Sequence, residues 1–343
     1  GTEIVFDSAD FAGLLDRFEQ HFNCASLRDQ LRRRRQAGER AGFGIGYFVE
    51  KSGLGPFGIA RVSLMPDGRV EIVTGAASVG QGIETAMAQI CTEVIPVPLE
   101  DITVIHGQTD RIAEGRGAFA SRVTAMTGSA VHICSEKLRE DILAVAGRLL
   151  QSPAYELQIT DGRIVLKKDQ SGASVTLAEV ASAGAGEGAT LSVEDKFLCD
   201  HMTYPYGIHG AVVNIDEATG SVSVERLLIA YDIGRAVNPV LVEGQITGGA
   251  AQGIGGALLE EFVYDESGQP LAATFADYLM PTVREMPPVE TLIAEDAPSP
   301  INPLGVKGAG EAGINAVGAA IASAIDEALG RPGAVAQLPV TPR

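Results

Sequence analysis

The run Gly305-Val306-Lys307-Gly308-Ala309-Gly310-Glu311-Ala312-Gly313 is the most informative stretch of the sequence. It places one carboxylate, Glu311, among four glycines and a lysine. Glycine has no Cβ, so a backbone this rich in glycine can approach another group closely. The small apolar residues from Ala316 to Leu329 predict a buried helix directly after it. A carboxylate where such a loop meets a helix N-terminus favours a chemical role over packing.

The composition describes a large and acidic chain. It has 343 residues, 45% apolar content and a formal net charge of −18. This length predicts about two domains, and no apolar run approaches the roughly 18 residues of a membrane span. The acidic balance disfavours nucleic acid, whose phosphates require clustered Lys and Arg. We interpret the one basic run, Arg32 to Arg35, as the solvated face of a helix or a contact for an acidic partner.

Cysteine and histidine usage argues against a metal site made by the chain itself. No secretory signal is visible, which predicts a cytoplasmic protein, and a first residue Gly1 suggests a processed or incomplete N-terminus. His201 and His209 flank a short turn without a third ligand nearby, which predicts structural or pocket-rim roles. Without any CxxC spacing, buried free thiols in a reducing compartment are expected rather than zinc or iron–sulfur ligands. The cysteines are Cys24, Cys91, Cys134 and Cys199.

The apolar pattern alternates between helical and strand periods and predicts an α+β fold with mixed sheets. Ser8 or Asp7 is the expected N-cap of the first helix. A further hairpin is expected around Asp161-Gly162. Helices are predicted at 11–22, 26–40, 83–94, 124–150, 244–261 and 316–329. Strands are predicted at 44–49, 59–64, 70–74, 102–105, 211–215 and 222–229.

The chain is expected to divide into an N-terminal helical segment and two related subdomains. The helical segment covers residues 1–40, subdomain A covers 41–188, and subdomain B, with Glu311, covers 189–343. Both subdomains share one plan, in which a hairpin, a glycine-rich turn and a small-residue helix follow one another. The stretch 184–188 is a plausible connector.

Three glycine-rich helix starts are predicted, at 80–85, at 243–249 and at the Glu311 loop. A helix N-terminus presents unpaired N–H groups and partial positive charge, which favours phosphate. Gln81 and Gln245 each add an amide that donates and accepts. For any one cluster, a tight helix crossing is the alternative. Neither standard nucleotide fingerprint, GxxxxGK[ST] or a strand-linked GxGxxG, is present.

The stretch 117–124 adds polar groups before the predicted long helix. Ser121 and Thr124 offer hydroxyls, and Arg122 offers a planar donor fork suited to phosphate. A simple N-cap by Ser121 is the alternative interpretation.

Together these stretches resemble the large subunit of the molybdenum hydroxylases, the family of xanthine dehydrogenase, aldehyde oxidoreductase and aerobic carbon monoxide dehydrogenase. They occur in family order, and they cover only its second, C-terminal molybdopterin-binding domain. The sequence departs from many relatives at Phe119-Ala120, where paired glycines are common. The matching runs are 80–85 with Gln89, 120–122 with 126–128, 232–239, 243–255, 278–282 and 307–313.

The resemblance implies the roles of the site residues. Glu311 would face the metal as the catalytic base, and Lys307 either keeps it ionised or is an exposed loop lysine. The pterin dithiolene would hold the molybdenum, so no protein metal ligand is expected. The implied cofactor contacts are Gly80, Gln81, Gly82, Ser121, Arg122, Thr124, Asn238, Gln245, Gly308 and Gly310.

The resemblance also implies an activity and partners. The enzyme would be a molybdenum-dependent oxidoreductase that hydroxylates an aldehyde, purine or N-heteroaromatic carbon with oxygen from water. Its cofactor would be molybdopterin in the cytosine dinucleotide form, with molybdenum. The expected partners are the subunit with the first molybdopterin-binding domain, an iron–sulfur subunit, a flavin subunit with FAD, and a small-molecule substrate. The chain is then one subunit of a split enzyme or a processed half.

Two other functions fit parts of the pattern. A non-catalytic cofactor carrier or assembly subunit would keep the glycine-rich turns but would not need a carboxylate at position 311. An unrelated nucleotide-binding module would use the same phosphate contacts, and molybdenum analysis would distinguish it.

Overall fold

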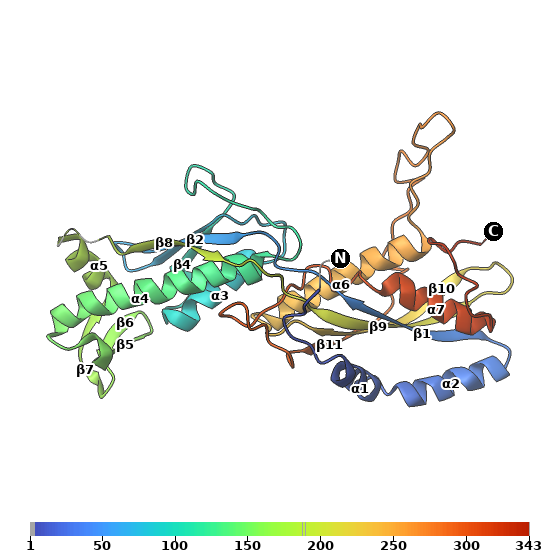
Figure 1. Ribbon diagram of the computed structural model, residues 1–343, viewed down its shortest axis with the longest axis horizontal. Helices are drawn as coiled ribbons and strands as arrows, with labels where there is room; N and C mark the ends of the chain where they lie inside the picture. Colours follow the sequence, from blue (N-terminus) through green and yellow to red (C-terminus); the bar gives the residue numbers. More distant parts are fainter. Residues whose placement is uncertain (1–3, 187, 189, 343) are drawn as a thin grey trace. The chain divides into compact units, whose positions relative to one another are not determined.

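The computed structural model describes residues 4–186, 188 and 190–342 and has mixed α and β structure (Figure 1). Gly1 and Glu187, the latter within the expected connector, lie outside this range. The described chain forms two compact units, which interleave along the sequence. The sequence-based division into 41–188 and 189–343 stays a prediction. Unit 1 comprises Gly1–Lys51, Tyr204–Pro298 and Ala309–Arg343, and unit 2 comprises Ser52–Thr203 and Ser299–Gly308.

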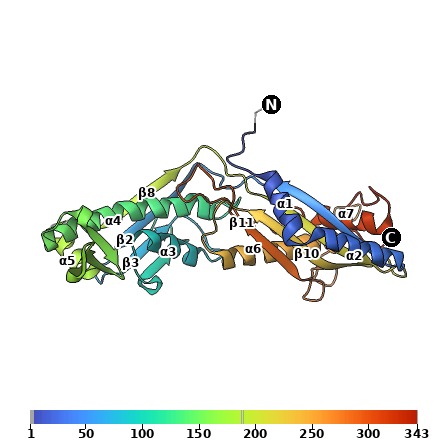
Figure 2. The same cartoon turned by 90° about the horizontal axis from the view of Figure 1, so that it is seen from below.

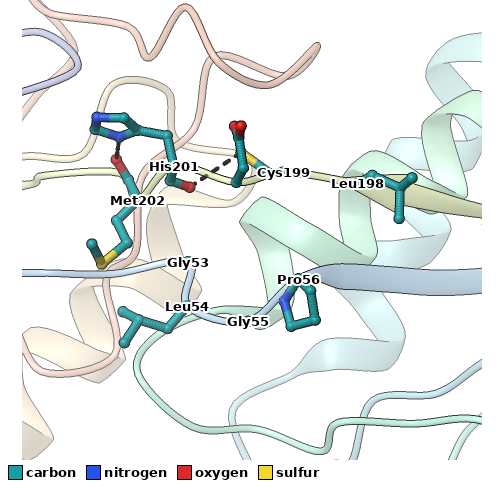
Figure 3. Close-up of a pocket in the computed structure, with 9 residues that line it drawn as sticks. Gly53, Leu54, Gly55, Pro56, Leu198, Cys199, His201 and Met202 are labelled. Carbon is teal, nitrogen blue, oxygen red and sulfur yellow. Dashed lines mark hydrogen bonds between the residues drawn. The ribbon is translucent and has the colours of Figure 1, made fainter.

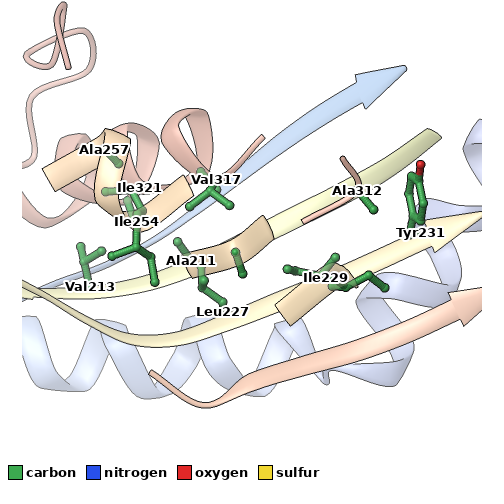
Figure 4. Close-up of a cluster of buried hydrophobic side chains, with 14 of the residues drawn as sticks. Ala211, Val213, Leu227, Ile229, Tyr231, Ile254, Ala257, Ala312, Val317 and Ile321 are labelled. Atoms are coloured by element: carbon green, nitrogen blue, oxygen red, sulfur yellow. The ribbon is translucent and has the colours of Figure 1, made fainter. Parts of the chain in front are cut away.

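Unit 1 is a mixed four-stranded sheet with helices on both faces (Figure 2). Its order is β1-β9-β10-β11, and only the β10–β11 pair is parallel. Successive strand residues point to opposite faces, so β10 sends Leu227 and Ile229 toward α6 and α7, and Leu228 toward α1 and α2 (Figure 4). The strands are β1 (Arg40–Val49), β9 (Tyr206–Ile215), β10 (Val222–Asp232) and β11 (Val289–Ala294). The helices are α1 (Phe11–His21), α2 (Cys24–Gln36), α6 (Pro239–Leu258) and α7 (Val317–Leu329).

Three alternating glycines on β1 bring α7 into direct contact with the sheet. A Cβ added to Gly44 would lie 2.2 Å from the Ala320 carbonyl oxygen, and one added to Gly42 would lie 2.0 Å from that of Ala324. A Cβ added to Gly46 would lie 2.8 Å from the Ala316 carbonyl oxygen. The predicted buried helix is confirmed, and its alanines recur every four residues on the face that meets these glycines.

The first helix begins at Phe11 as predicted, but its N-cap is not one of the two residues expected. Asp10, rather than Ser8 or Asp7, is its N-cap, and its carboxylate accepts a hydrogen bond from the Gly13 amide at 2.9 Å. Ser8 instead donates to the Ala297 carbonyl, and Asp7 accepts from the Tyr204 amide. Both side chains therefore tie the N-terminal segment to other parts of unit 1.

Unit 2 contains a mixed sheet in the order β4-β3-β2-β8 and a separate antiparallel sheet β5-β6-β7. Only the β3–β4 pair is parallel, and α4 lies against β2 and β8. The expected hairpin at Asp161-Gly162 joins β5 to β6. The strands are β2 (Phe57–Leu64), β3 (Val70–Thr74), β4 (Ile102–Ile105), β5 (Leu157–Thr160), β6 (Arg163–Leu166), β7 (Asp169–Thr176) and β8 (Ser192–Leu198). The helices are α3 (Ile83–Val94), α4 (Ser129–Leu150) and α5 (Leu177–Gly186).

The loose internal repeat is confirmed in the order of elements. In unit 2 the hairpin β2–β3 leads through a glycine turn to α3 and then to the parallel strand β4. In unit 1 the hairpin β9–β10 leads to α6 and then to the parallel strand β11. The α+β class with mixed sheets is likewise confirmed.

Two predicted boundaries are wrong, and one predicted helix has an unusual first turn. The glycines at 244 and 248 lie inside α6, because Asn238 caps that helix and Pro239 occupies its first turn. The predicted helix 124–150 is confirmed, and its first turn, Val123–Gly128, is π-helical and packs on Gly58 of β2. Gly184 to Gly186 end α5 rather than forming a connector.

The basic run and the cysteines serve the chain's own packing. Arg32 pairs with Asp29, Arg34 pairs with Glu225 and Glu39, and Arg35 pairs with Glu327, so three of the four arginines are paired within unit 1. Burial raises the pKa of the Cys91 thiol to about 11 and that of Cys134 to about 12, which keeps both protonated. Cys24 is also buried, whereas Cys199 is only half-buried. None of the helices in the described residues combines the length and apolar content that a bilayer crossing requires.

We expect Gly44→Ala to lower the free energy of unfolding by about 1–3 kcal/mol, because the new methyl group overlaps the α7 backbone. Gly256→Ala is the matched control, since a Cβ there meets nothing within 4 Å and alanine favours a helix. Urea unfolding would measure both variants. An unchanged midpoint for Gly44→Ala would contradict the tight contact of β1 with α7.

Candidate functional site

In unit 2 the first glycine turn is held by its own glutamine. The Gln81 side chain accepts from the Val79 amide at 2.7 Å and donates to the Ala77 carbonyl at 3.3 Å. Gly80 and Gly82 have φ of +98° and +77°, and Gly82 is the N-cap of α3, so this predicted helix start is confirmed. The turn therefore presents the first amides of α3 beside open space at Gly80.

The loop before the π-helical turn is strained where it meets Gly308. Ala120 and Ser121 both have φ of +49°, a left-handed conformation that costs non-glycine residues about 1–2 kcal/mol each. A Cβ added to Gly308 would lie 2.4 Å from the Ser121 Cβ. The Gly308 amide donates to the Ser52 hydroxyl at 3.0 Å. Unit 2 thus brings Ser121 and Gly308 together at one place.

Two neighbouring side chains of this loop differ in what they contact. Arg122 is buried, and its guanidinium donates to the carbonyls of Leu54, at 2.7 Å, and Phe57. Burial lowers the pKa of Arg122. Thr124 lies in the π-helical turn, and its hydroxyl makes no hydrogen bond among the described residues. Arg122 therefore holds the 54–57 segment, while the Thr124 hydroxyl is available to a ligand.

The segment that Arg122 holds lines a pocket of about 670 Å³ (Figure 3). Its walls are residues 53–56 and 198–202. The Cys199 thiol donates to the His201 carbonyl at 3.1 Å, and the His201 ring is 2.9 Å from the Met202 carbonyl. His201 thus has the expected pocket-rim position. Sequence reasoning did not predict this pocket, because its two walls come from distant segments.

In unit 1 the 232–239 turn positions α6. Asp232 is buried, and its carboxylate accepts from the amides of Gly234, Asp296 and Ala297 at 2.9–3.2 Å. Asn238 accepts from the Leu241 amide at 3.0 Å as the N-cap. Gln245 follows in α6, half-buried, and its amide makes no hydrogen bond among the described residues.

Glu311 is exposed in a turn that packs on the same helix. The turn precedes α7, which begins at Val317, so Glu311 does not lie directly at a helix N-terminus as expected. A Cβ added to Gly313 would lie 2.0 Å from the Ile246 carbonyl. Ile246 follows Gln245 in α6. The predicted base, Glu311, and the predicted cofactor contact, Gln245, therefore both belong to unit 1. Lys307, in unit 2, is buried rather than an exposed loop lysine.

A buried polar layer supports the Glu311 turn from behind. The fully buried His209 donates its Nε2 proton to the Ala312 carbonyl at 2.8 Å, because a carbonyl can only accept. Its Nδ1 has no hydrogen-bond partner among the described residues. Burial lowers the pKa of His209 to about 4, so the imidazole is neutral at pH 7. Its structural role is therefore confirmed.

A second carboxylate, Glu50, belongs to this layer. It is 8% exposed and accepts from the Tyr231 hydroxyl and from the Asn315 amide, both at 3.1 Å. Burial first, and then the charge of Glu50, raise the pKa of Tyr231 well above its usual value. Figure 4 shows Tyr231 and Ala312 at the same end of the core. The sequence did not indicate Glu50, because its partners lie 181 and 265 residues away.

The family model of the molybdopterin cofactor-binding domain matches residues 17–287. The chain belongs to the molybdenum hydroxylase family. This membership confirms the resemblance and rules out the unrelated nucleotide-binding module. Among the described residues of this molybdopterin-binding domain, no group of three or more His, Cys, Asp or Glu side chains could hold a metal ion.

Relatives of this molybdopterin-binding domain include two proteins of Paenarthrobacter nicotinovorans. The 6-hydroxypseudooxynicotine dehydrogenase complex subunit gamma is 38% identical over all of this chain and 44% of its own length. The nicotine 6-hydroxylase large subunit is 32% identical over 99% of this chain and 44% of its own length. Our chain thus spans less than half of these relatives.

Solved structures agree with the fold. Quinoline 2-oxidoreductase from Pseudomonas putida 86 aligns with a TM-score of 0.86 and 31% identity, over 94% of this chain and 43% of its own. A Cu,Mo-CO dehydrogenase aligns with a TM-score of 0.85 and 28% identity, over 95% and 43%.

The neutral His209 should make stability depend on pH. The unfolded chain binds a proton near pH 6.5, whereas the folded imidazole binds one only near pH 4. The free energy of unfolding should therefore fall by about 2 kcal/mol from pH 7 to pH 5. His209→Gln should flatten this slope, and the exposed His21→Gln should not. Urea unfolding at several pH values would measure it, and an unchanged slope in His209→Gln would contradict the assignment.

At position 120 the backbone is left-handed, so glycine should be more stable there than the native alanine. We expect Ala120→Gly to raise the free energy of unfolding by up to about 1 kcal/mol, because strain exceeds the entropy cost of glycine. Gly117→Ala should lower it, since φ there is +62° although space is open. Opposite results for the pair, measured by thermal unfolding, would contradict the loop conformation.

Proposed function

We propose that this chain is the catalytic second half of the molybdenum-binding part of a heteromeric hydroxylase. One observation carries the proposal. Glu311 is exposed on a turn that Gly313, Ala312 and Asn315 fix to α6 and to buried side chains. A fixed and solvent-facing carboxylate is suited to general base catalysis.

The donor set fits a large, phosphate-bearing pterin. The amide of Gln245 and the hydroxyl of Thr124 make no hydrogen bond within the described chain, and open space adjoins Gly80 and Gly244. In unit 2 we assign cofactor contacts to Gly80, Gln81, Gly82, Ser121, Arg122, Thr124 and Gly308. In unit 1 we assign them to Asn238, Gln245 and Gly310.

The chemistry divides between the cofactor and the chain. Bound molybdopterin would hold the molybdenum, which would take up the two electrons of substrate oxidation. The Glu311 carboxylate would accept one proton from the water whose oxygen bonds to an electron-poor carbon, while the C–H bond of that carbon breaks and gives up the two electrons and a second proton. His209, neutral and hydrogen-bonded to Ala312, keeps the Glu311 turn in place without adding positive charge.

The relatives support a choice of substrate and partners. Two are named for nicotine and quinoline, which favours an N-heteroaromatic substrate over an aldehyde or a purine. One is named as a subunit of a complex. We propose a subunit with the first molybdopterin-binding domain, an iron–sulfur subunit and a flavin subunit with FAD as partners. The cytosine dinucleotide form of the cofactor and a cytoplasmic location complete the proposal.

Glu311→Gln should lower the turnover of an N-heteroaromatic substrate by about 10²–10⁴-fold in the purified complex, because the base is lost while its shape is kept. Molybdenum and pterin content should stay unchanged. The exposed Glu140→Gln on α4 is the matched control and should keep full activity. Activity within tenfold of the parent would exclude Glu311 as the base and favour a non-catalytic carrier.

A further inference from the structure

The connection from α6 to β11 is much longer than its counterpart in the repeat. In unit 2 the equivalent path from α3 to β4 takes seven residues, 95–101, whereas residues 259–288 use thirty. A parallel crossover of this kind therefore does not require such a length. Connections longer than about 15 residues without secondary structure are commonly functional. We call residues 259–288 the arm; it projects from the end of α6 (Figure 1).

The arm is an ordered structure held by its own hydrogen bonds. The Leu271 amide donates to the Val263 carbonyl at 2.8 Å, and Tyr264 bridges to Pro270. At its base the Tyr278 hydroxyl donates to Glu260 at 2.6 Å. A preformed arm loses little conformational entropy when a partner binds it.

Many large apolar side chains of the arm are exposed to solvent. It holds eight of the 24 exposed large apolar residues in the described chain, although it is a small part of that chain. Val283 is 89% and Phe275 is 80% exposed, and Phe262, Tyr264, Leu271 and Met280 are at least half exposed. These side chains add nothing to the core, and such clusters mark protein interfaces, where aromatic residues and Met are enriched.

We infer that the arm docks on the molybdopterin-binding part that this chain does not span. This inference rests on the proposed function, because the proposed function supplies the partner, the first molybdopterin-binding domain. The family model continues to residue 287 and so includes nearly all of the arm, while the relatives carry more than half of their length outside the matched region. The part of the relatives that lies outside the matched region is therefore a partner that members of the family have in common.

Charge disfavours a second copy as the occupant. The arm has six carboxylates and one arginine, and the whole chain has a net charge of −18. Two such surfaces would repel each other, whereas an apolar surface with a basic rim would be complementary.

The test uses the complex purified from its own cells through a tag on this chain. Phe275→Asp with Val283→Asp should lower recovery of the partner part at least tenfold. The control, Leu149→Asp with Tyr155→Asp, changes two exposed apolar residues of unit 2 and should keep full recovery. Thermal unfolding should be unchanged in both double variants, because all four side chains are exposed.

A photo-crosslinker at position 275 gives a second readout that needs no disruptive change. Mass spectrometry should find it joined to the molybdopterin-binding part outside this chain, whether that part is a separate subunit or continues the same polypeptide. Crosslinks to a second copy or to unit 2 would overturn the inference, and so would full recovery of a separate partner subunit with the Asp variant. Loss of activity without loss of recovery in Glu311→Gln keeps the two proposals separable.

Discussion

The contact of the β1 glycines with α7 is the constraint on which unit 1 depends. Helices normally pack on sheets through layers of side chains, but Gly44 and its neighbours allow the α7 backbone to touch the strand. This close approach fixes both the height and the rotation of α7 over the sheet. The chain that enters α7 is therefore also fixed, and the Glu311 turn is part of that chain.

The groups that support the Glu311 turn from behind, His209 and Tyr231, are uncharged. Behind it lie an uncharged imidazole, His209, and a tyrosine, Tyr231, whose pKa is raised well above its usual value by burial first and then by Glu50. Neither group adds a positive charge near the turn at neutral pH. A general base works best when its pKa lies near the operating pH, and a positive charge close to a carboxylate lowers its pKa. The layer thus supplies rigidity without a counterion.

How much the sequence predicted follows from the range of the interactions. Helices such as 83–94 and strands such as 70–74 were predicted correctly, because their periods are local. The predicted start of α6 at residue 244 is wrong, because Asn238-Pro239 is a stronger start signal than the glycines at 244 and 248. Glu50 could not be found, because a buried carboxylate differs from an exposed one only through distant partners.

The repeat explains why glycine turns recur in both units. Each hairpin ends in a strand that is parallel to the strand after the next helix, so each unit has one crossover helix beginning at the carboxyl end of a strand. Ligands of open α/β sheets bind outside such strand ends, where helix amides are unpaired. The Gln81 turn in unit 2 and the Asn238 turn in unit 1 occupy equivalent positions of this kind. One plan, used twice, therefore equips each unit with a turn suited to the same kind of anionic cofactor.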